Sequence, residues 1–215
     1  MRKGEKEYFR KRMPKILEAL KKKGYDPYFF ESTDEARSFI LESIDPNETV
    51  AIGGSITIRE DLSIKEELRK RGNQVIDHWE ASGDWARVIE LKRKNREADV
   101  FLSGLNALSS DGILVNLDGG GNRVASLCSG PKRVIVVAGV NKIVESVDLG
   151  IHRTRKKVAV MTALRLNAKA PCVQTGECID CDVPGRICAA LLILMKKPGD
   201  IDEFSVILIN EFLGF

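Results

Sequence analysis

The sequence predicts an α/β fold, in which a mostly parallel sheet carries helices on both faces. Short apolar runs alternate with amphipathic segments along the chain, and this alternation is typical of parallel sheets. The run PKRVIVVAGVNKIV has the pattern of a strand buried on both faces, because its apolar residues are continuous rather than alternating. We therefore expect a three-layer α/β/α sandwich whose central sheet includes residues 50–52, 100–104 and 133–138.

Helices are expected where apolar residues recur at helical spacing. The first covers residues 4–23 and ends at Gly24. Thr33 is the expected N-cap of the second, whose first turn carries two acidic residues. A third helix is expected to be interrupted near Ser63 and to end at Gly72. Three more helical segments are expected, at residues 84–98, 121–130 and 145–169.

The remaining strands are expected at residues 73–79, 99–108 and 112–119, where short apolar runs adjoin turn-forming residues. Two last apolar runs, 188–197 and 203–210, flank the turn-forming sequence PGDID. This arrangement predicts a terminal hairpin, which would add antiparallel strands to the fold.

Length and composition indicate one globular domain over residues 1–215. A chain of 215 residues suffices for one core, and 43% hydrophobic with 30% charged residues is ordinary for such a domain. The net charge of +3 lacks the basic excess of most nucleic-acid binders. No apolar stretch of a signal peptide follows the basic N-terminus, and the longest apolar run, 187–195, is too short to span a bilayer. We expect a cytoplasmic protein without a membrane span or a nucleic-acid partner.

The stretch AIGGSIT places a glycine pair where a strand passes into a helix. Gly53 and Gly54 allow a ligand to approach the backbone closely, while the N–H groups near Ser55 point outward from a helix start. Such a turn binds phosphate or carboxylate groups. The same residues are equally typical of a tight turn with a serine cap, so this stretch alone leaves both interpretations open.

A second stretch, GLNALSSDGILVNLDGGGNRVASL, combines a glycine run with polar residues of several kinds. Arginine is the usual partner of carboxylate and phosphate groups, and open α/β sheets bind ligands at strand ends. The spacing is not that of the dinucleotide fingerprint, and the polar residues are also compatible with ordinary turns. We favour a ligand site, with Asp111 as the candidate for proton transfer. Its candidate binding residues are Asn106, Asn116, Gly119, Gly120, Gly121, Asn122 and Arg123.

Four of the five cysteines lie within residues 172–188, with the spacing C-x5-C-x2-C-x6-C. Disulfides are unexpected without a secretion signal, and buried free thiols would not cluster in a loop rich in Pro, Gly and Asp. The loop therefore predicts a metal site, which is either an iron–sulfur cluster or zinc. Its ligands are Cys172, Cys178, Cys181 and Cys188. Cys128 is expected in the core, and the spacing of His78 and His152 suggests no metal site.

Taken in order, AIGGSIT, the DGGGNR stretch, GPKRVIVVAGVNKIV and TGECIDC resemble the LUD domain of lactate-utilisation proteins. The resemblance covers nearly the whole chain. It implies an α/β/α sandwich similar to sugar-phosphate isomerases and CoA transferases, and a link to lactate oxidation by iron–sulfur complexes. It also adds Asn141 and Lys142 to the candidate ligand residues. The cysteine loop is absent from some branches of the family, so its presence implies a branch that holds its own metal.

Two functions follow from these features. The first is a redox-associated subunit that binds a small carboxylate or phosphate metabolite beside an iron–sulfur cluster, with other oxidoreductase subunits as partners. The second is a stand-alone isomerase or transferase in which zinc pins the loop. CoA transferases use a glutamate nucleophile, and the glycine-rich stretches contain no glutamate. A ligand-binding protein without catalysis is a third alternative, so the sequence leaves enzymatic activity open.

Overall fold

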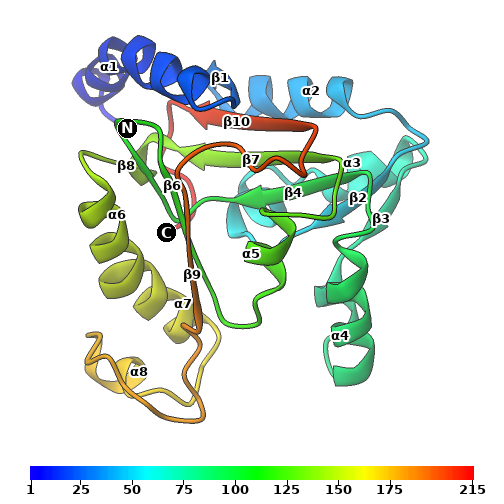
Figure 1. The fold of residues 1–215 in the computed structure, drawn as a ribbon, viewed down its shortest axis with the longest axis vertical. Helices are drawn as coiled ribbons and strands as arrows, with labels where there is room; N and C mark the ends of the chain where they lie inside the picture. Colours follow the sequence, from blue (N-terminus) through cyan, green and yellow to red (C-terminus); the bar gives the residue numbers. More distant parts are fainter.

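The computed structural model describes residues 1–215, and its centre is a six-stranded parallel sheet (Figure 1). The strand order is β1-β10-β7-β4-β2-β3, with every neighbouring pair parallel. The fold is the predicted three-layer α/β/α sandwich. The strands are β1 (Asp26–Phe30), β2 (Thr49–Ile52), β3 (Gln74–Ile76), β4 (Val100–Gly104), β7 (Arg133–Gly139) and β10 (Glu203–Ile209).

Both faces of the sheet are buried, which explains the continuous apolar runs of its strands. In β7, Val134 and Val136 belong to one hydrophobic cluster, whereas Ile135 and Val137 belong to the other. Successive side chains of a strand point to opposite faces, so both faces must be covered. On one face the cover consists of α2 (Thr33–Ser43), η1 (Thr57–Asp61) and α3 (Lys65–Lys70), which all contribute to the second cluster.

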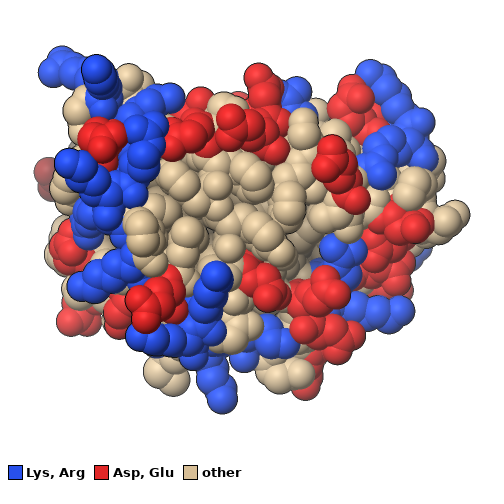
Figure 2. Space-filling model, turned by 90° about the horizontal axis from the view of Figure 1, so that it is seen from above, with Lys and Arg blue, Asp and Glu red and all other residues tan.

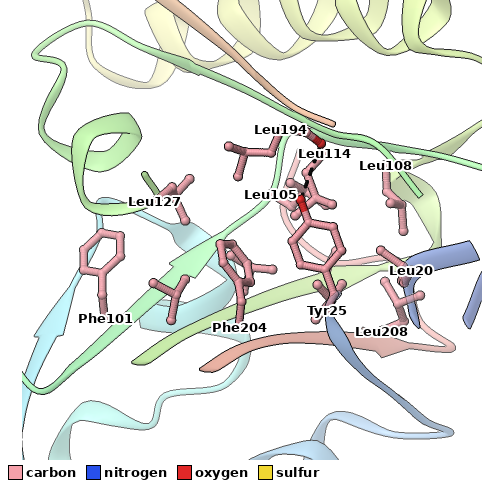
Figure 3. Packing of buried hydrophobic residues seen from close by; sticks show 14 of the residues in the cluster. Leu20, Tyr25, Phe101, Leu105, Leu108, Leu114, Leu127, Leu194, Phe204 and Leu208 are labelled. Atoms are coloured by element: carbon pink, nitrogen blue, oxygen red, sulfur yellow. Dashed lines mark hydrogen bonds between the residues drawn. The ribbon is translucent and has the colours of Figure 1, made fainter. Parts of the chain in front are cut away.

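A second sheet and α1 (Lys3–Lys22) cover the other face. This sheet has the order β8-β5-β6-β9, and β6 is antiparallel to both of its neighbours. Figure 3 shows Leu114 and Leu194 of this sheet above Phe204 of the central sheet. Tyr25 packs edge-on against Phe204, with ring centroids 5.1 Å apart. The strands are β5 (Ala107–Ser109), β6 (Leu114–Asp118), β8 (Ile143–Val144) and β9 (Ala190–Leu194).

The remaining helical elements connect the strands of the two sheets. The predicted helix at 145–169 is a continuous run of α6 (Val147–Arg153), a π-helical turn η4 (Thr154–Val158) and α7 (Ala159–Arg165). The other elements are η2 (His78–Ala81), α4 (Trp85–Lys94), α5 (Asn122–Ser126), η3 (Val140–Lys142) and α8 (Cys172–Thr175). No helix combines the length and the apolar character needed to cross a membrane.

The terminal hairpin predicted from the last two apolar runs is wrong. β10 lies between β1 and β7 in the parallel sheet, whereas β9 pairs with β6 in the other sheet. Similarly, the single strand expected at 99–108 is divided between β4 and β5, which belong to different sheets. Apolar runs identify strands, but they do not identify the partner of each strand.

Local signals are closer to expectation. The second helix is capped by Ser32 rather than by Thr33, because the Ser32 hydroxyl accepts the Glu35 N–H at 3.3 Å. The Thr33 hydroxyl instead donates to Glu211 at 2.6 Å. The expected interruption near Ser63 is confirmed, since its positive φ of 48° separates η1 from α3.

The free edge at β1 lies on the side of the molecule seen in Figure 2, where neutral residues occupy the middle and charged residues surround them. Pro27 in this strand has no N–H to offer a further strand. Tyr28 packs against Phe39 of α2 with ring centroids 4.4 Å apart. A proline and surrounding charges limit pairing of this edge with other chains.

We expect the substitution Phe204→Ala to destabilise the protein by about 3–5 kcal/mol, because Phe204 is fully buried between the two sheets. The matched control is Phe212→Ala, whose ring is 53% exposed. This control should change the free energy of unfolding by no more than about 0.5 kcal/mol. Urea denaturation of both variants measures the difference, and equal midpoints would contradict the packing described here.

Candidate functional site

A cavity of about 520 Å³ opens where β2 and β4 end. Its walls come from the turn after β2, from η2 and α4, from the DGGGNR turn after β6, and from η4 and α7. Arg186, Ile187 and Cys188 at the end of the cysteine loop complete one wall, and Gly214 and Phe215 another. Segments spread between Gly54 and Phe215 therefore line one space.

The structure brings the two glycine-rich stretches together at this cavity. They do not follow strands of one parallel sheet, because the first turn follows β2 whereas the DGGGNR turn follows β6 of the second sheet. Position 119 requires glycine because the main chain of Ile187 passes close to it. A Cβ atom on Gly119 would lie 2.5 Å from the Ile187 carbonyl oxygen. The predicted ligand residues that line the cavity are Gly54, Ser55, Asn106, Gly119, Gly120, Asn122, Arg123 and Lys142.

The other predicted site residues lie outside the cavity lining. A Cβ atom on Gly53 would lie 3.1 Å from the Phe101 ring, so this glycine serves packing beneath the turn. Asn141 holds the main chain of Leu213 through two hydrogen bonds of 3.1 Å.

Asp111 is exposed and accepts a hydrogen bond from Ser109. Gly121 and Asn116 also lie outside, and Asn116 is fully buried.

Three neighbouring cations form an inner cluster at the cavity, in which Arg123 and Lys142 line the space and Arg153 lies behind the lining. The Arg123 guanidinium donates to the Asn106 side-chain oxygen at 3.0 Å and to the Leu117 carbonyl. Arg153 donates to the main-chain oxygen of Asn106. Lys142 is only 4% exposed, and its ammonium donates to the main-chain oxygen of Phe215. None of the three forms an ion pair with an aspartate or glutamate side chain.

The surroundings of the inner cluster lower the pKa values of its three cations and so favour their neutral forms. Burial, together with the neighbouring Arg153 and Arg123, lowers the pKa of Lys142 to about 7, while Asp61 opposes the shift. Burial also lowers the pKa values of Arg123 and Arg153. The one carboxylate in the lining, Asp118, accepts backbone N–H groups of the α5 turn, including that of Arg123 at 2.7 Å.

Several polar atoms in the cavity wall have no partner within the protein. The Thr154 hydroxyl is fully buried on η4 and makes no hydrogen bond. His78 is 7% exposed with its Nδ1 unpaired, and the indole N–H of Trp79 is likewise unpaired. Because buried polar groups are almost always hydrogen-bonded, these atoms indicate places for ligand or water.

Residues of η2 and α4 were not predicted as site residues, and His78 was regarded as incidental. Both tryptophans of the protein, Trp79 and Trp85, line the cavity together with His78 and Lys92. An ion-pair network holds η2, since the buried Asp77 carboxylate accepts both Arg59 hydrogen bonds at 2.7 Å. The only local signals were Asp77 and Asp84, each of which caps the element that follows it.

The four loop cysteines line a second, smaller space of about 20 Å³ that adjoins the main cavity. All four thiols are free. Burial raises the pKa of Cys172, and the nearby Cys181, Cys178 and Cys188 raise it further. No three metal-binding side chains are arranged closely enough to hold an ion as they stand. The donors nevertheless fit a metal chemically, because four thiols of a single loop face one space.

Arginine side chains position this loop. Arg186 donates to the main-chain oxygens of Cys181 at 2.7 Å and Cys188 at 2.9 Å. Arg155 pairs with Asp180 at 2.6 Å. Arg186, Ile187 and Cys188 line both the small space and the large cavity, so the two share a wall. Cys128 lies apart from the loop and packs against the hydrophobic core, as expected.

Comparisons with known proteins agree with this fold. No curated protein matches the chain. A solved structure titled as a DUF162 family protein from Deinococcus radiodurans is similar, with a TM-score of 0.50 and 13% sequence identity over 93% of this chain and 97% of that chain. This likeness concerns the fold alone. The model of the LUD domain matches residues 13–209, and the chain therefore belongs to the LUD domain family.

Proposed function

We propose that the protein binds a small anionic metabolite in the cavity, beside an iron–sulfur cluster held by the cysteine loop. The observation that supports anion binding is the inner cluster of Lys142, Arg123 and Arg153. None of these side chains forms an ion pair with a carboxylate side chain. Asp61 and Asp118 act on Lys142 and Arg123 only from a distance, without a direct ion pair. Buried charges that lack a direct partner are costly, so an anion entering the cavity would reduce an existing penalty. Carboxylate and phosphate groups both fit these donors.

The cavity is less suited to isomerase or transferase chemistry. The isomerase and CoA-transferase reactions considered from the sequence use a carboxylate as base or nucleophile. Asp118 is the one acid in the lining, and its carboxylate accepts the N–H groups of Gly120, Arg123 and Val124. Asp111, the residue predicted for proton transfer, lies outside the lining. Binding of an anion is therefore favoured over acid–base catalysis by these residues.

The metal part of the proposal rests on the four thiols that surround one space. Cys172, Cys178, Cys181 and Cys188 would hold the group, and Arg155 and Arg186 fix the loop that carries them. An iron–sulfur cluster supplies one-electron transfer. The wall shared with the cavity favours such a cluster over a structural zinc, since a bound metabolite would lie next to it. A role as a subunit in lactate oxidation, implied by the resemblance, remains part of this proposal.

Anion binding should depend on the protonation of Lys142. Its pKa of about 7 means that the ammonium forms as the pH falls through neutrality. Sulfate stays a dianion in this range, the guanidinium groups stay charged, and His78, with a pKa lowered to about 4, stays neutral. We expect sulfate affinity, measured by calorimetry, to rise roughly tenfold between about pH 8.5 and pH 6.

The matched variant for this test is Lys142→Met, which keeps the length of the side chain but cannot be protonated. It should bind sulfate weakly, with affinity nearly independent of pH over the same range. A pH dependence that persists in Lys142→Met would assign the effect to another group. Affinity that is flat in the parent protein would contradict the role of Lys142.

The cysteine loop should bind metal as a unit. In protein purified without oxygen, Cys178→Ala and Cys181→Ala should each abolish stoichiometric metal, because loss of one thiolate leaves an open coordination position. Cys128→Ala is the control and should retain the full content. Iron, zinc and sulfide analysis with a visible spectrum separates cluster from zinc. Four freely titrating loop thiols in metal-free anaerobic protein would contradict the proposal.

A further inference from the structure

We propose that the anion bound in this cavity is the phosphate end of a nucleoside phosphate, whose base stacks on Trp85. The inference rests on the proposed anion binding and names the class of ligand. The inner cations would hold the phosphate, and the tryptophan side of the cavity would hold the base. Three independent features carry it, namely the size of the cavity, its charge and its aromatic wall.

The cavity is larger than a simple anion requires. Its volume of about 520 Å³ lies within the roughly 300–1,000 Å³ that is usual for sites of cofactor-sized ligands. The lining includes both Lys142 on η3 and Trp85 on α4, two elements that are distant in the chain. A sulfate-sized anion at the inner cluster would leave the side lined by η2 and α4 empty.

The charge of the lining favours a ligand with more than one negative charge. Beyond the inner cluster, Lys92, Arg165 and Arg186 add three further cations to the wall. Asp118, the one acidic residue in the lining, is already engaged by backbone N–H groups. A monocarboxylate would neutralise one of these cations, whereas a phosphate or diphosphate accepts several charge-assisted hydrogen bonds at once.

The part of the wall formed by η2 and α4 has the features of a base-binding surface. Trp85 is 70% exposed, which is unusual for so large an apolar side chain, and Lys92 lies over its ring at 5.5 Å. Trp79 is fixed by Arg59 and Arg165, which lie 5.2 and 5.4 Å from its ring. Its unpaired indole N–H and the unpaired Nδ1 of His78 can meet polar atoms of the sugar or base. Stacking on an aromatic side chain accepts any base, because every base has a π-face.

The two tryptophans make the test direct, because both line the cavity and the protein has no others. Binding of adenosine 5′-monophosphate, adenosine 5′-diphosphate, ribose 5-phosphate, adenosine and sulfate is measured by tryptophan fluorescence and calorimetry. We expect at least one of the two nucleotides to quench the fluorescence and to bind roughly tenfold tighter than ribose 5-phosphate, which has the phosphate but no base. Adenosine alone should bind weakly.

The variant Trp85→Ala should lose this roughly tenfold advantage and leave the affinity for ribose 5-phosphate unchanged. The matched control is Tyr8→Ala, which removes another exposed ring that lies beneath a cation, with Arg12 5.1 Å from its centroid. This control lies on α1, outside the cavity lining, and should bind nucleotides as the parent does.

Other outcomes overturn the inference in distinguishable ways. Equal binding of nucleotides and ribose 5-phosphate, or nucleotide binding unaffected by Trp85→Ala, would reject the base site but leave anion binding intact. Binding of sulfate without binding of either nucleotide would do the same. Failure of the folded protein to bind any of these anions would reject the proposed function together with the inference.

Discussion

Burial of β7 and β10 on both faces is the constraint on which the rest of the structure depends. Their side chains alternate between two hydrophobic clusters, and covering a valine or isoleucine contributes about 1.5–3 kcal/mol. Neither face can be left to solvent, so each needs its own layer. Helices supply one of these layers. The other is built by α1 together with the second sheet, so β6 lies over the strand ends of the central sheet (Figures 1 and 3).

The position of the second sheet explains why a charged cavity exists in this fold. The turn after β6 carries Arg123, and η3 carries Lys142 between the two sheets. Arg123 thereby reaches Asn106, in the connection from β4 to β5, and Lys142 lies near Arg123. Packing of the apolar strands thus supplies the free energy that holds cations close to one another. Burial is the main reason that Lys142 favours its neutral form, and repulsion from Arg153 and Arg123 adds to it.

The sequence predicted features that leave a local pattern, and it missed those that depend on contacts between distant residues. Continuous apolar runs identified β2, β4 and β7, because double-sided burial leaves a local pattern. Strand partners leave none, so β9 and β10 were wrongly paired. The glycine stretches drew attention to the cavity, although Gly119 serves a contact with Ile187 that no local pattern encodes. Trp79 and Trp85 were missed because their importance arises only when η2 and α4 line the same cavity as Arg123 and Lys142.

The shared wall gives the two proposed ligands a physical means of influencing each other. Arg186 bonds to the main chain of Cys181 and Cys188, and its own side chain borders the anion cavity. Drawing four thiols onto a metal would have to tighten the loop, because they are not arranged to hold an ion as they stand. Arg186 would move with the carbonyls that it binds. Any resulting change in anion affinity must be matched by an equal change in metal affinity, since the coupling free energy between two sites is reciprocal.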